Sequence, residues 1–180
     1  MVYLDVQRKL HKLKDYEEVY ISLGSNKGDR FKALRSAVNA IKAFAQVEDA
    51  SPIYETPPWG FNSKQEFLNA VVKIKTNLDP EKLLDRLLEL EKEQGRYREI
   101  DMVGYQDRTI DLDILFYGKQ IVQQKNLFIP HPRLEKRMFI LKPLCDIAPN
   151  LYHPVIKRTI KQLLESTNDK TEIVRTSFHL

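Results

Sequence analysis

The chain has 180 residues, of which 42% are hydrophobic and 30% are charged, and its formal net charge is +4. These values are typical of a folded globular protein and exclude a disordered chain. No apolar run approaches the roughly 18 residues that a membrane span needs, and a single cysteine, Cys145, excludes an intrachain disulfide. We therefore expect one cytoplasmic domain over residues 17–180, with residues 1–16 as an N-terminal extension of unassigned role.

The positive charge is unevenly distributed along the chain. Residues 125–161 are strongly basic, because lysines and arginines far outnumber the two acids of this stretch, Glu135 and Asp146. A local basic field favours a polyanionic partner, which is either a nucleic acid or the phosphates of a nucleotide. Charge alone does not separate these two classes.

Apolar spacing predicts alternating strands and helices in the first half of the chain. A strand at 18–23 ends in the turn 24–28, and a helix follows the N-cap residue Asp29. The turn lacks the Gly-Lys-Ser/Thr ending of a P-loop, so we interpret it as a tight connection. A second strand lies within 46–56 and a third at 66–75. Alternation in the third strand separates two faces, Leu68, Ala70, Val72 and Ile74 on one and Phe67, Asn69, Val71 and Lys73 on the other.

The second half begins with a helix that starts at Asp79-Pro80 and ends at Gly95. Residues 96–107 have no clean period, and loops of this length in compact domains are usually functional or disordered. A strand follows at 108–117. The remaining elements are a short return strand and two helices, near 120–122, 134–145 and 157–166. The order β-α-β-β-α-β with a helical end predicts an α+β ferredoxin-like sandwich, a mostly antiparallel sheet with helices packed on it.

The strand at 108–117 is expected to carry two carboxylates on one face. Its alternation places four apolar side chains on the other face, Ile110, Leu112, Ile114 and Phe116. Asp111 and Asp113 would lie about 7 Å apart along the strand, where like charges repel unless a cation sits between them. Mg²⁺ prefers one or two carboxylates together with phosphates and water, so the pair suits Mg²⁺ bound to a polyphosphate. The alternative is a half-buried strand whose wet face simply carries acids.

Aromatic and amide side chains elsewhere suit a slot for a flat polar ring. Trp59, Phe67 and Phe139 offer faces for stacking, and the amide of Asn69 can read a ring edge. Each residue also has a simpler interpretation, because isolated aromatic side chains are usually part of a core.

Six motifs, in chain order over about residues 18–155, are similar to those of one enzyme family. They are Leu-Gly-Ser-Asn at 23–26, Tyr-Glu-Thr-Pro-Pro-Trp-Gly at 54–60, Phe-Leu-Asn-Ala at 67–70, Glu-x-x-x-Gly-Arg-x-Arg at 91–98, Arg-Thr-Ile-Asp-Leu-Asp-Ile-Leu at 108–115, and Pro-His-Pro-Arg-Leu-x-x-Arg-x-Phe-x-Leu-x-Pro-Leu at 130–144. Together they resemble the 6-hydroxymethyl-7,8-dihydropterin pyrophosphokinases of folate biosynthesis.

The resemblance implies transfer of pyrophosphate from ATP to the hydroxymethyl group of the pterin, with release of AMP. It assigns Asp111 and Asp113 to two Mg²⁺ ions that the ATP phosphates also hold. It places Arg96 and Arg98 in a loop that closes over the reacting groups. These two aspartates and two arginines are the expected catalytic residues.

The resemblance also implies how the two substrates are held. Arg108, His131 and Arg137 would contact the triphosphate, with Glu91 and Ile114 near the nucleotide. Phe67 and Phe139 would sandwich the pterin ring. The residues expected to read the ring edge are Thr56, Pro57, Pro58, Trp59 and Asn69.

Two other functions compete with this one. A non-enzymatic RNA-binding module would suit the basic stretch, but it should show an aromatic-rich Lys/Arg-Gly-Phe-x-Phe strand, and none is present. A two-metal nuclease would explain the acids but not Asn69 or the Thr-Pro-Pro-Trp loop. The expected partners are therefore ATP and the pterin, with no nucleic acid and no membrane, and we expect a monomer.

Overall fold

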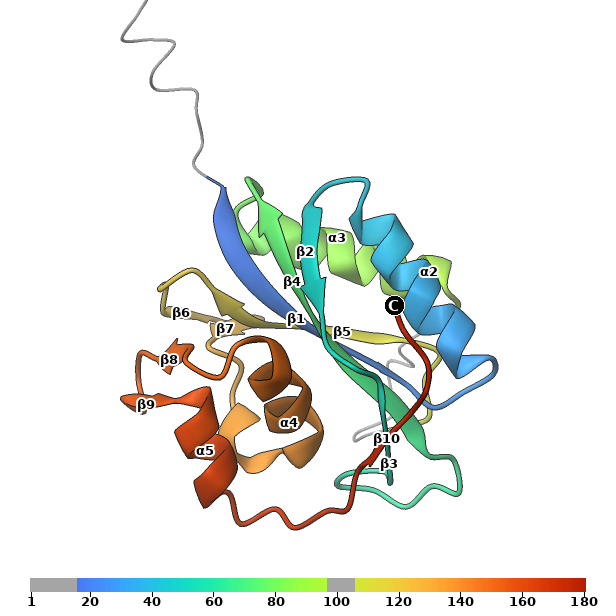
Figure 1. Ribbon diagram of the computed structural model, residues 1–180. Helices are drawn as coiled ribbons and strands as arrows, with labels where there is room; N and C mark the ends of the chain where they lie inside the picture. The colour runs from blue at the N-terminus through green and yellow to red at the C-terminus, as the bar shows by residue number, and fades with distance from the viewer. Residues whose placement is uncertain (1–15, 97–105) are drawn as a thin grey trace, which may run out of the picture.

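An antiparallel sheet forms the centre of the computed structural model, which describes residues 16–96 and 106–180 (Figure 1). The described residues form six strands in this sheet, and every pairing is antiparallel. The path runs β10-β3-β4-β1-β5, and β2 pairs with the other end of β4. The strands are β1 (Glu17–Ser25), β2 (Gln46–Ala50), β3 (Tyr54–Thr56), β4 (Phe67–Thr76), β5 (Asp111–Tyr117) and β10 (Val174–Arg175).

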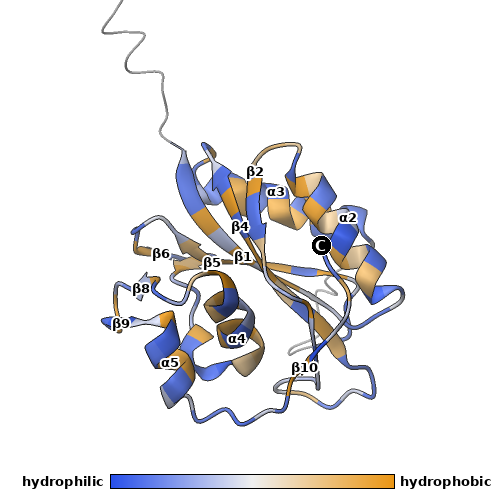
Figure 2. Ribbon diagram, viewed as in Figure 1, coloured by the Kyte–Doolittle hydropathy of each residue, from blue (hydrophilic) through white to orange (hydrophobic). Residues whose placement is uncertain are grey.

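Helices pack on both faces of this sheet, because the central strands β1 and β4 bury side chains on both of their faces. The described helices are α2 (Arg30–Ile41) and α3 (Pro80–Glu93) on one face and α4 (Met138–Ile147) and α5 (Ile160–Ser166) on the other. In Figure 2 the strands and α4 carry many of the hydrophobic residues, whereas the segment between α5 and β10 is mostly hydrophilic. The predicted α+β class, with a mostly antiparallel sheet and helices packed on it, is confirmed. The predicted extension 1–16 lies outside the described residues except for Tyr16.

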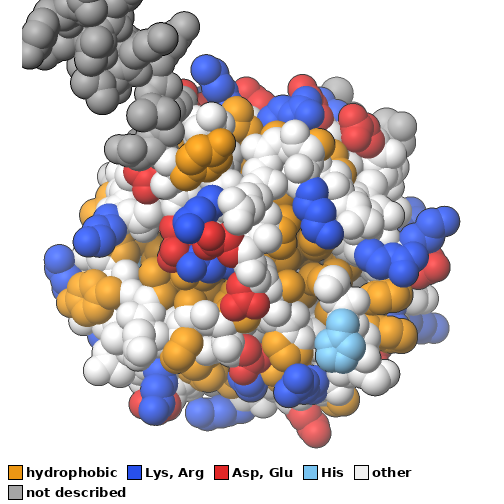
Figure 3. Space-filling view, turned by 45° about the horizontal axis from the view of Figure 1, so that its top comes forward, with side chains coloured by type: hydrophobic (Ala, Val, Ile, Leu, Met, Phe, Trp, Pro, Cys, Tyr) orange, Lys and Arg blue, Asp and Glu red, His pale blue; other side chains and the backbone are white. Residues whose placement is uncertain are grey.

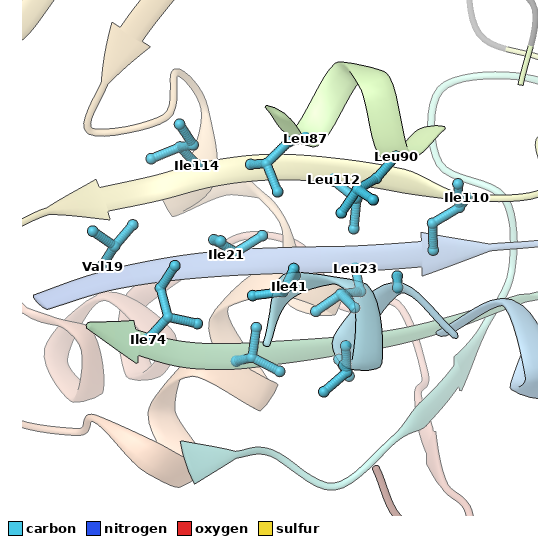
Figure 4. Close-up of a cluster of buried hydrophobic side chains, with 14 of the residues drawn as sticks. Val19, Ile21, Leu23, Ile41, Ile74, Leu87, Leu90, Ile110, Leu112 and Ile114 are labelled. Atoms are coloured by element: carbon cyan, nitrogen blue, oxygen red, sulfur yellow. The ribbon is translucent and has the colours of Figure 1, made fainter. Parts of the chain in front are cut away.

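The first core lies between the sheet and the pair α2 and α3 (Figure 4). Leu68, Ala70, Val72 and Ile74 of β4 all face this core, as predicted. The Asp29 cap and the Gly95 stop are as expected, since the Asp29 carboxylate accepts a hydrogen bond from the Lys32 N–H at 3.0 Å and Gly95, with φ of +81°, follows α3. Asp79 precedes α3, as expected, but makes no side-chain cap. Complete burial of a Leu, Val or Ile side chain in this core stabilises the fold by roughly 1.5–3 kcal/mol.

A β-bulge at Leu115 corrects one sequence prediction. Ile114 pairs with Ile21 and Phe116 pairs with Tyr20, so β5 contains one residue more than β1 between these two pairs. A bulge shifts the alternation by one residue. Phe116 therefore faces the second core, between the sheet and α4, and not the first core with Leu112 and Ile114.

Several element bounds differ from the prediction because short local pairings interrupt the apolar pattern. The single strand expected within 46–56 is divided into β2 and β3 at Ser51, whose hydroxyl and N–H both bond the backbone of Val71. In place of the single return strand expected near 120–122, residues 122–129 form a hairpin. The last helix, expected from 157, starts at Ile160 because residues 152–159 form another hairpin. The remaining elements are β6 (Val122–Gln124), β7 (Leu127–Ile129), the 3₁₀ turn η1 (Leu134–Lys136), β8 (Tyr152–His153) and β9 (Arg158–Thr159). Within residues 16–96 and 106–180, no helix has the length and apolar character that crossing a bilayer requires.

Candidate active site

A cavity of about 640 Å³ opens at the end of the sheet where β1 finishes and β4 and β5 begin. The loop after β3 and the segment that leads into α4 complete its walls. Twelve of the sixteen residues predicted for the site line it. They are Thr56, Pro57, Trp59, Phe67, Asn69, Arg96, Arg108, Asp111, Asp113, His131, Arg137 and Phe139.

The remaining four predicted residues are not among the described residues that line the cavity. Arg98 lies outside the described residues. Pro58 and Glu91 do not line the cavity, and the Ile114 side chain is buried in the first core, on the opposite face of β5 from Asp113. The predicted contacts of Pro58, Glu91 and Ile114 with substrates stay predictions.

Two carboxylates stand side by side on the cavity face of β5, as the alternation predicted. Asp111 forms ion pairs with the Nη1 atom of Arg96 and with the Nε atom of Arg108, the latter at 3.1 Å. The Nε2 atom of His131 lies 3.9 Å from Asp113. Loss of hydration, together with the nearby charges of Asp111 and Glu91, raises the pKa of Asp113 to about 7. The two carboxylates of Asp111 and Asp113 therefore favour the binding of an additional cation.

The donor set fits Mg²⁺ that is shared with phosphate. In the part of the chain that the structure describes, no group of three or more His, Cys, Asp or Glu side chains could hold a metal by itself. Two carboxylates with open space in front of them leave coordination positions for water and phosphate oxygens, which is the arrangement that Mg²⁺ favours.

Glu91 holds Arg96 against this carboxylate pair. Its Oε1 atom accepts hydrogen bonds from Arg96 Nη1 at 2.5 Å and from the Leu112 N–H at 2.8 Å. Burial acts to lower the pKa of Arg96, but the charges of Asp111 and Glu91 outweigh it and raise this pKa. Glu91 is itself buried. It therefore joins α3 to the start of β5 and orients an arginine towards the cavity.

The other side of the cavity presents a buried amide beside an aromatic ring. The Asn69 Nδ2 atom donates a hydrogen bond to the Thr56 hydroxyl at 2.8 Å, and both residues are buried. Phe67 lies on the same face of β4, two residues earlier. This hydrogen bond fixes which edge of the amide meets a ligand and leaves Oδ1 as an acceptor.

Gly24 lies between the amide side and the carboxylate side, and sequence reasoning missed its part in the site. It pairs with Asn69 of β4 and with Asp111 of β5. A Cβ atom at this position would lie 3.0 Å from Asn69 Oδ1 and 3.9 Å from Asp111 Cβ. Only glycine leaves the cavity floor open here. The Leu-Gly-Ser-Asn motif gave a signal for this, but the signal was interpreted as a tight connection only.

Asn26, from the same motif, fixes the segment that leads into β5. Its side-chain Oδ1 atom accepts from the Arg108 N–H at 2.8 Å, and its Nδ2 atom donates to the Asp107 carboxylate at 2.5 Å. The Asn26 N–H also donates to the Arg108 carbonyl at 3.1 Å. Both backbone groups of Arg108 are thus held by one fully buried residue.

Arginine side chains stack on the aromatic rings of the cavity. The Arg108 guanidinium lies 5.2 Å from the centroid of the Phe67 ring. The Arg137 guanidinium lies 4.7 Å from the Trp59 ring and 5.8 Å from the Phe139 ring. Cation–π contacts of this kind hold the rings and the guanidinium groups in one place. The aromatic slot and the phosphate-binding side predicted from sequence therefore share one cavity.

His131 contributes a neutral ring to this cavity. Burial and the positive charge of Arg137 lower its pKa to about 4. The resemblance grouped it with Arg108 and Arg137 as a contact of the triphosphate. Unlike these arginines, its ring is an uncharged hydrogen-bonding group near neutral pH. Residues that line the cavity without having been assigned to it include Lys27, Phe61, Asp107, Thr109 and Arg133.

A sheet end with paired carboxylates, arginines and aromatic rings defines a site for transferring phosphate to a ring-bearing acceptor. Comparison with known proteins agrees with this class. Residues 20–149 match the model of the family described as 7,8-dihydro-6-hydroxymethylpterin-pyrophosphokinase. The chain belongs to this family.

Individual relatives support the assignment. The chain is 41% identical over 144 residues to 2-amino-4-hydroxy-6-hydroxymethyldihydropteridine pyrophosphokinase of Aquifex aeolicus, covering 80% of this chain and 88% of the relative. It is 45% identical over 131 residues to the protein of the same name from Bacillus subtilis, covering 72% of this chain and 77% of the relative. The Folic acid synthesis protein fol1 of Pneumocystis carinii is 46% identical over 157 residues, which cover 86% of this chain but 21% of that protein.

The fold is shared with more distant solved structures. The Plasmodium falciparum HPPK-DHPS wild type with SDX-DHP has a TM-score of 0.70 and 17% sequence identity, covering 84% of this chain and 44% of that one. This likeness supports the fold alone. Neither the RNA-binding module nor the nuclease considered from sequence receives support from the comparisons.

Proposed function

We propose that the cavity between β1, β4, β5 and α4 transfers pyrophosphate from MgATP to the 6-hydroxymethyl group of 6-hydroxymethyl-7,8-dihydropterin, releasing AMP, in tetrahydrofolate biosynthesis. The observation that carries this proposal is that Asn69 and Asp111 pair with the same residue, Gly24, from opposite sides. A ring read by Asn69 thus lies beside a metal held at Asp111. Such proximity is the main requirement of phosphoryl transfer.

In this proposal the pterin occupies the side of the cavity formed by β3, β4 and α4. Phe67 and Phe139 stack on its two faces, and Asn69 with the loop 56–59 reads its edge. A buried amide with a fixed orientation discriminates strongly against rings that lack the matching groups, because its own polar atoms would be left unpaired. The Thr56 hydroxyl supports this role, since it fixes Asn69.

The nucleotide occupies the side formed by β5 and the segment 131–137. Arg108, His131 and Arg137 contact the triphosphate. Glu91 acts on this side through Arg96, and Ile114 belongs to the same strand, with its side chain on the other face of β5. Guanidinium groups suit phosphate oxygens because they form paired, charge-assisted hydrogen bonds. The stacking of Arg108 and Arg137 on aromatic rings supports the assignment, because it keeps both cations at the cavity.

Asp111 and Asp113 hold two Mg²⁺ ions, which supply charge neutralisation for the phosphates and orientation of the acceptor hydroxyl. The hydroxyl oxygen of the pterin forms a bond to the β-phosphorus while the bond from this phosphorus to the oxygen bridging to the α-phosphate breaks. AMP leaves with that oxygen, and the hydroxyl proton passes to solvent. Arg96, held by Glu91, and Arg98 close over the reacting groups and exclude water.

The test identifies the nucleotide product. The full chain is mixed with Mg²⁺, ATP and 6-hydroxymethyl-7,8-dihydropterin, and products are separated by anion-exchange chromatography. AMP and a pterin carrying two phosphates in equal amounts support the proposal. ADP, or no turnover under conditions in which the protein is folded, overturns it.

The proposal includes a monomeric cytoplasmic protein without a nucleic-acid or membrane partner. On the face drawn in Figure 3, acidic and basic side chains lie side by side, with hydrophobic side chains between them. Ion pairs such as Lys73–Glu18 and Lys75–Glu48, both at 2.6 Å, also join opposite charges. Nucleic-acid binding favours a patch of one sign. Sedimentation equilibrium and a filter-binding assay with RNA test these points, and a dimer or tight, salt-sensitive RNA binding would contradict them.

A further inference from the structure

The segment 167–180 lies beyond the residues that match the family model and runs back to the sheet, where it forms β10 beside β3. Figure 1 shows it leaving α5, passing along one end of the molecule and joining the sheet as β10 beside β3. Most of its residues before β10 are hydrophilic (Figure 2). Burial of apolar side chains therefore does not explain the position of this part, and its polar contacts carry the explanation.

Asp169 makes the first of these contacts, at the start of α4. Its Oδ2 atom accepts a hydrogen bond from the Met138 N–H at 2.8 Å. Its Oδ1 atom accepts from the N–H and the hydroxyl of Thr171, at 3.0 and 2.5 Å. Arg137, the residue before α4, makes no side-chain cap. Asp169 is therefore the carboxylate that satisfies the first N–H of this helix, where negative charge is also favoured by the helix dipole.

This contact bears on the pterin side because of what α4 carries. Met138 directly precedes Phe139, and Phe139 lines the cavity 6.3 Å from Trp59, measured between ring centroids. The position of the first turn of α4 sets the position of this ring. Asp169 therefore holds one wall of the slot from outside the cavity, because it does not line the cavity itself.

The second contact holds the wall formed by β3 and β4. Val174 pairs with Glu55 and Arg175 with Tyr54, so β10 covers the free edge of β3. The N–H and the hydroxyl of Thr176 both donate to the Ile53 carbonyl, at 2.9 and 3.1 Å. The strand β3 ends at Thr56, whose hydroxyl accepts the hydrogen bond from Asn69.

The end of the segment is anchored on residues that do not line the cavity. The Phe178 ring stacks on Phe31 of α2 with centroids 4.7 Å apart and planes 21° apart. Leu180 packs against the first core. The segment is thus attached at α4, at β3 and at α2, and its first two attachments flank the slot.

We infer that residues 167–178 act as a positioning strap for the pterin subsite. Asp169 fixes the Phe139 wall, which stacks on one face of the ring, and β10 fixes the Thr56–Asn69 wall, which reads the edge of the ring. This inference rests on the proposed function, because it uses the pterin site assigned there. The strap touches neither the carboxylate pair nor Arg108, and on the nucleotide side it reaches only Arg137, the residue before Met138, so ATP binding depends on it less than pterin binding does.

The test compares Asp169→Ala with a matched control. Thr159→Ala removes a side-chain cap of the same kind from α5, where the Thr159 hydroxyl accepts from the Gln162 N–H at 3.2 Å and the helix carries no residue of the cavity. Loss of either cap lowers stability by a similar amount. We expect Asp169→Ala to raise the KM for the pterin about five-fold, with the KM for ATP unchanged within about two-fold. Thr159→Ala leaves both KM values unchanged.

Two further variants separate positioning from simple destabilisation. Asp169→Asn retains an oxygen acceptor for the Met138 N–H, so it restores most of the pterin affinity. Thr176→Val removes the hydroxyl donor while keeping the backbone pairing of β10, and it raises the pterin KM less than Asp169→Ala. Thermal melting of each variant, followed by circular dichroism, identifies the temperature at which all of them are folded for the assay.

The outcomes are distinct from failure of the proposed function. If the unmodified protein produces no AMP, the proposed function fails and the strap has no substrate to position. If the unmodified protein is active but Asp169→Ala matches Thr159→Ala, or changes the KM for ATP and for the pterin equally, the strap inference is wrong. A selective rise in the pterin KM that Asp169→Asn reverses supports it.

Discussion

Asn69 and Asp111 lie on different strands but are both paired with Gly24 of β1. The distance between the amide and the carboxylate is therefore set by the spacing of antiparallel strands, about 4.7–4.9 Å from each strand to the next. A rigid backbone, more than loop geometry, fixes how far the two halves of the cavity lie from each other. A reaction that depends on the relative position of two substrates benefits from such a frame.

Gly24→Ala should affect the pterin side first. The added Cβ would lie 3.0 Å from Asn69 Oδ1, so the amide must shift by a few tenths of an ångström, whereas Asp111 Cβ lies at an ordinary contact distance of 3.9 Å. We expect the KM for the pterin to rise about ten-fold, equivalent to about 1.4 kcal/mol, with a smaller change in the KM for ATP. Steady-state kinetics with each substrate varied in turn provides the measurement.

Ser25→Ala is the matched control for this substitution. Ser25 is the next residue of β1, is fully buried, and its hydroxyl makes no hydrogen bond within the described residues. Its removal should leave both KM values unchanged. Equal KM values for Gly24→Ala and the unmodified protein would show that the amide does not read the pterin.

Asp111→Asn and Asp113→Asn should each abolish most turnover while the fold is kept. An amide keeps the shape of the side chain but removes the negative charge that holds Mg²⁺, and loss of such a charge costs about 100-fold or more in kcat. Mg²⁺ titration of activity and circular dichroism provide the measurements. Asp85→Asn, on the exposed side of α3, is the control and should be fully active. Full activity of either site variant would remove the metal assignment.

Arg98→Ala should slow the chemical step more than it weakens substrate binding. Arg98 lies outside the described residues, and the expectation comes from its place in the Glu-x-x-x-Gly-Arg-x-Arg motif. An arginine that acts only when the loop closes stabilises the transition state more than the bound substrates, so kcat falls while the pterin Kd changes little. Single-turnover kinetics and pterin fluorescence titration separate the two effects. Equal losses in both would argue against a closure role.

His153 should make the protein sensitive to mild acid. Its Nδ1 atom accepts from the N–H groups of Val155 and Ile156, at 3.3 and 3.2 Å, and its ring meets Phe116 edge-on at 5.5 Å. Burial lowers the pKa of this histidine below its usual 6.5. Below about pH 6.5 the unfolded chain therefore binds a proton that the folded protein does not, and stability falls as the pH falls.

His153→Asn tests this linkage, because asparagine offers an acceptor oxygen but does not titrate. Urea denaturation at several values between pH 7.5 and pH 5 should show a steeper loss of the free energy of unfolding in the unmodified protein. The difference in slope should not exceed about 1.4 kcal/mol per pH unit. Parallel curves would mean that the pKa of His153 is the same in the folded and unfolded states.

Local patterns in the sequence determined much of this molecule. The period-2 alternation of β4, the Asp29 cap and the Gly95 stop are set by residues near one another, so they could be predicted. The face that carries Asp111 and Asp113 followed from the same alternation, and the motifs identified the family. Sequence reasoning also brought most of the cavity residues together, because it used motifs whose members lie on strand ends.

Only the tertiary structure decided the relations that depend on pairing between distant segments. The bulge at Leu115, which turns Phe116 over, depends on the register between β5 and β1. The addition of β10 to the edge of β3, the cap that Asp169 gives α4 and the position of Gly24 between two strands join residues that lie far apart in the chain. A periodic pattern specifies which face of an element is apolar, but the partner and register of each strand are set by the packing of the whole sheet.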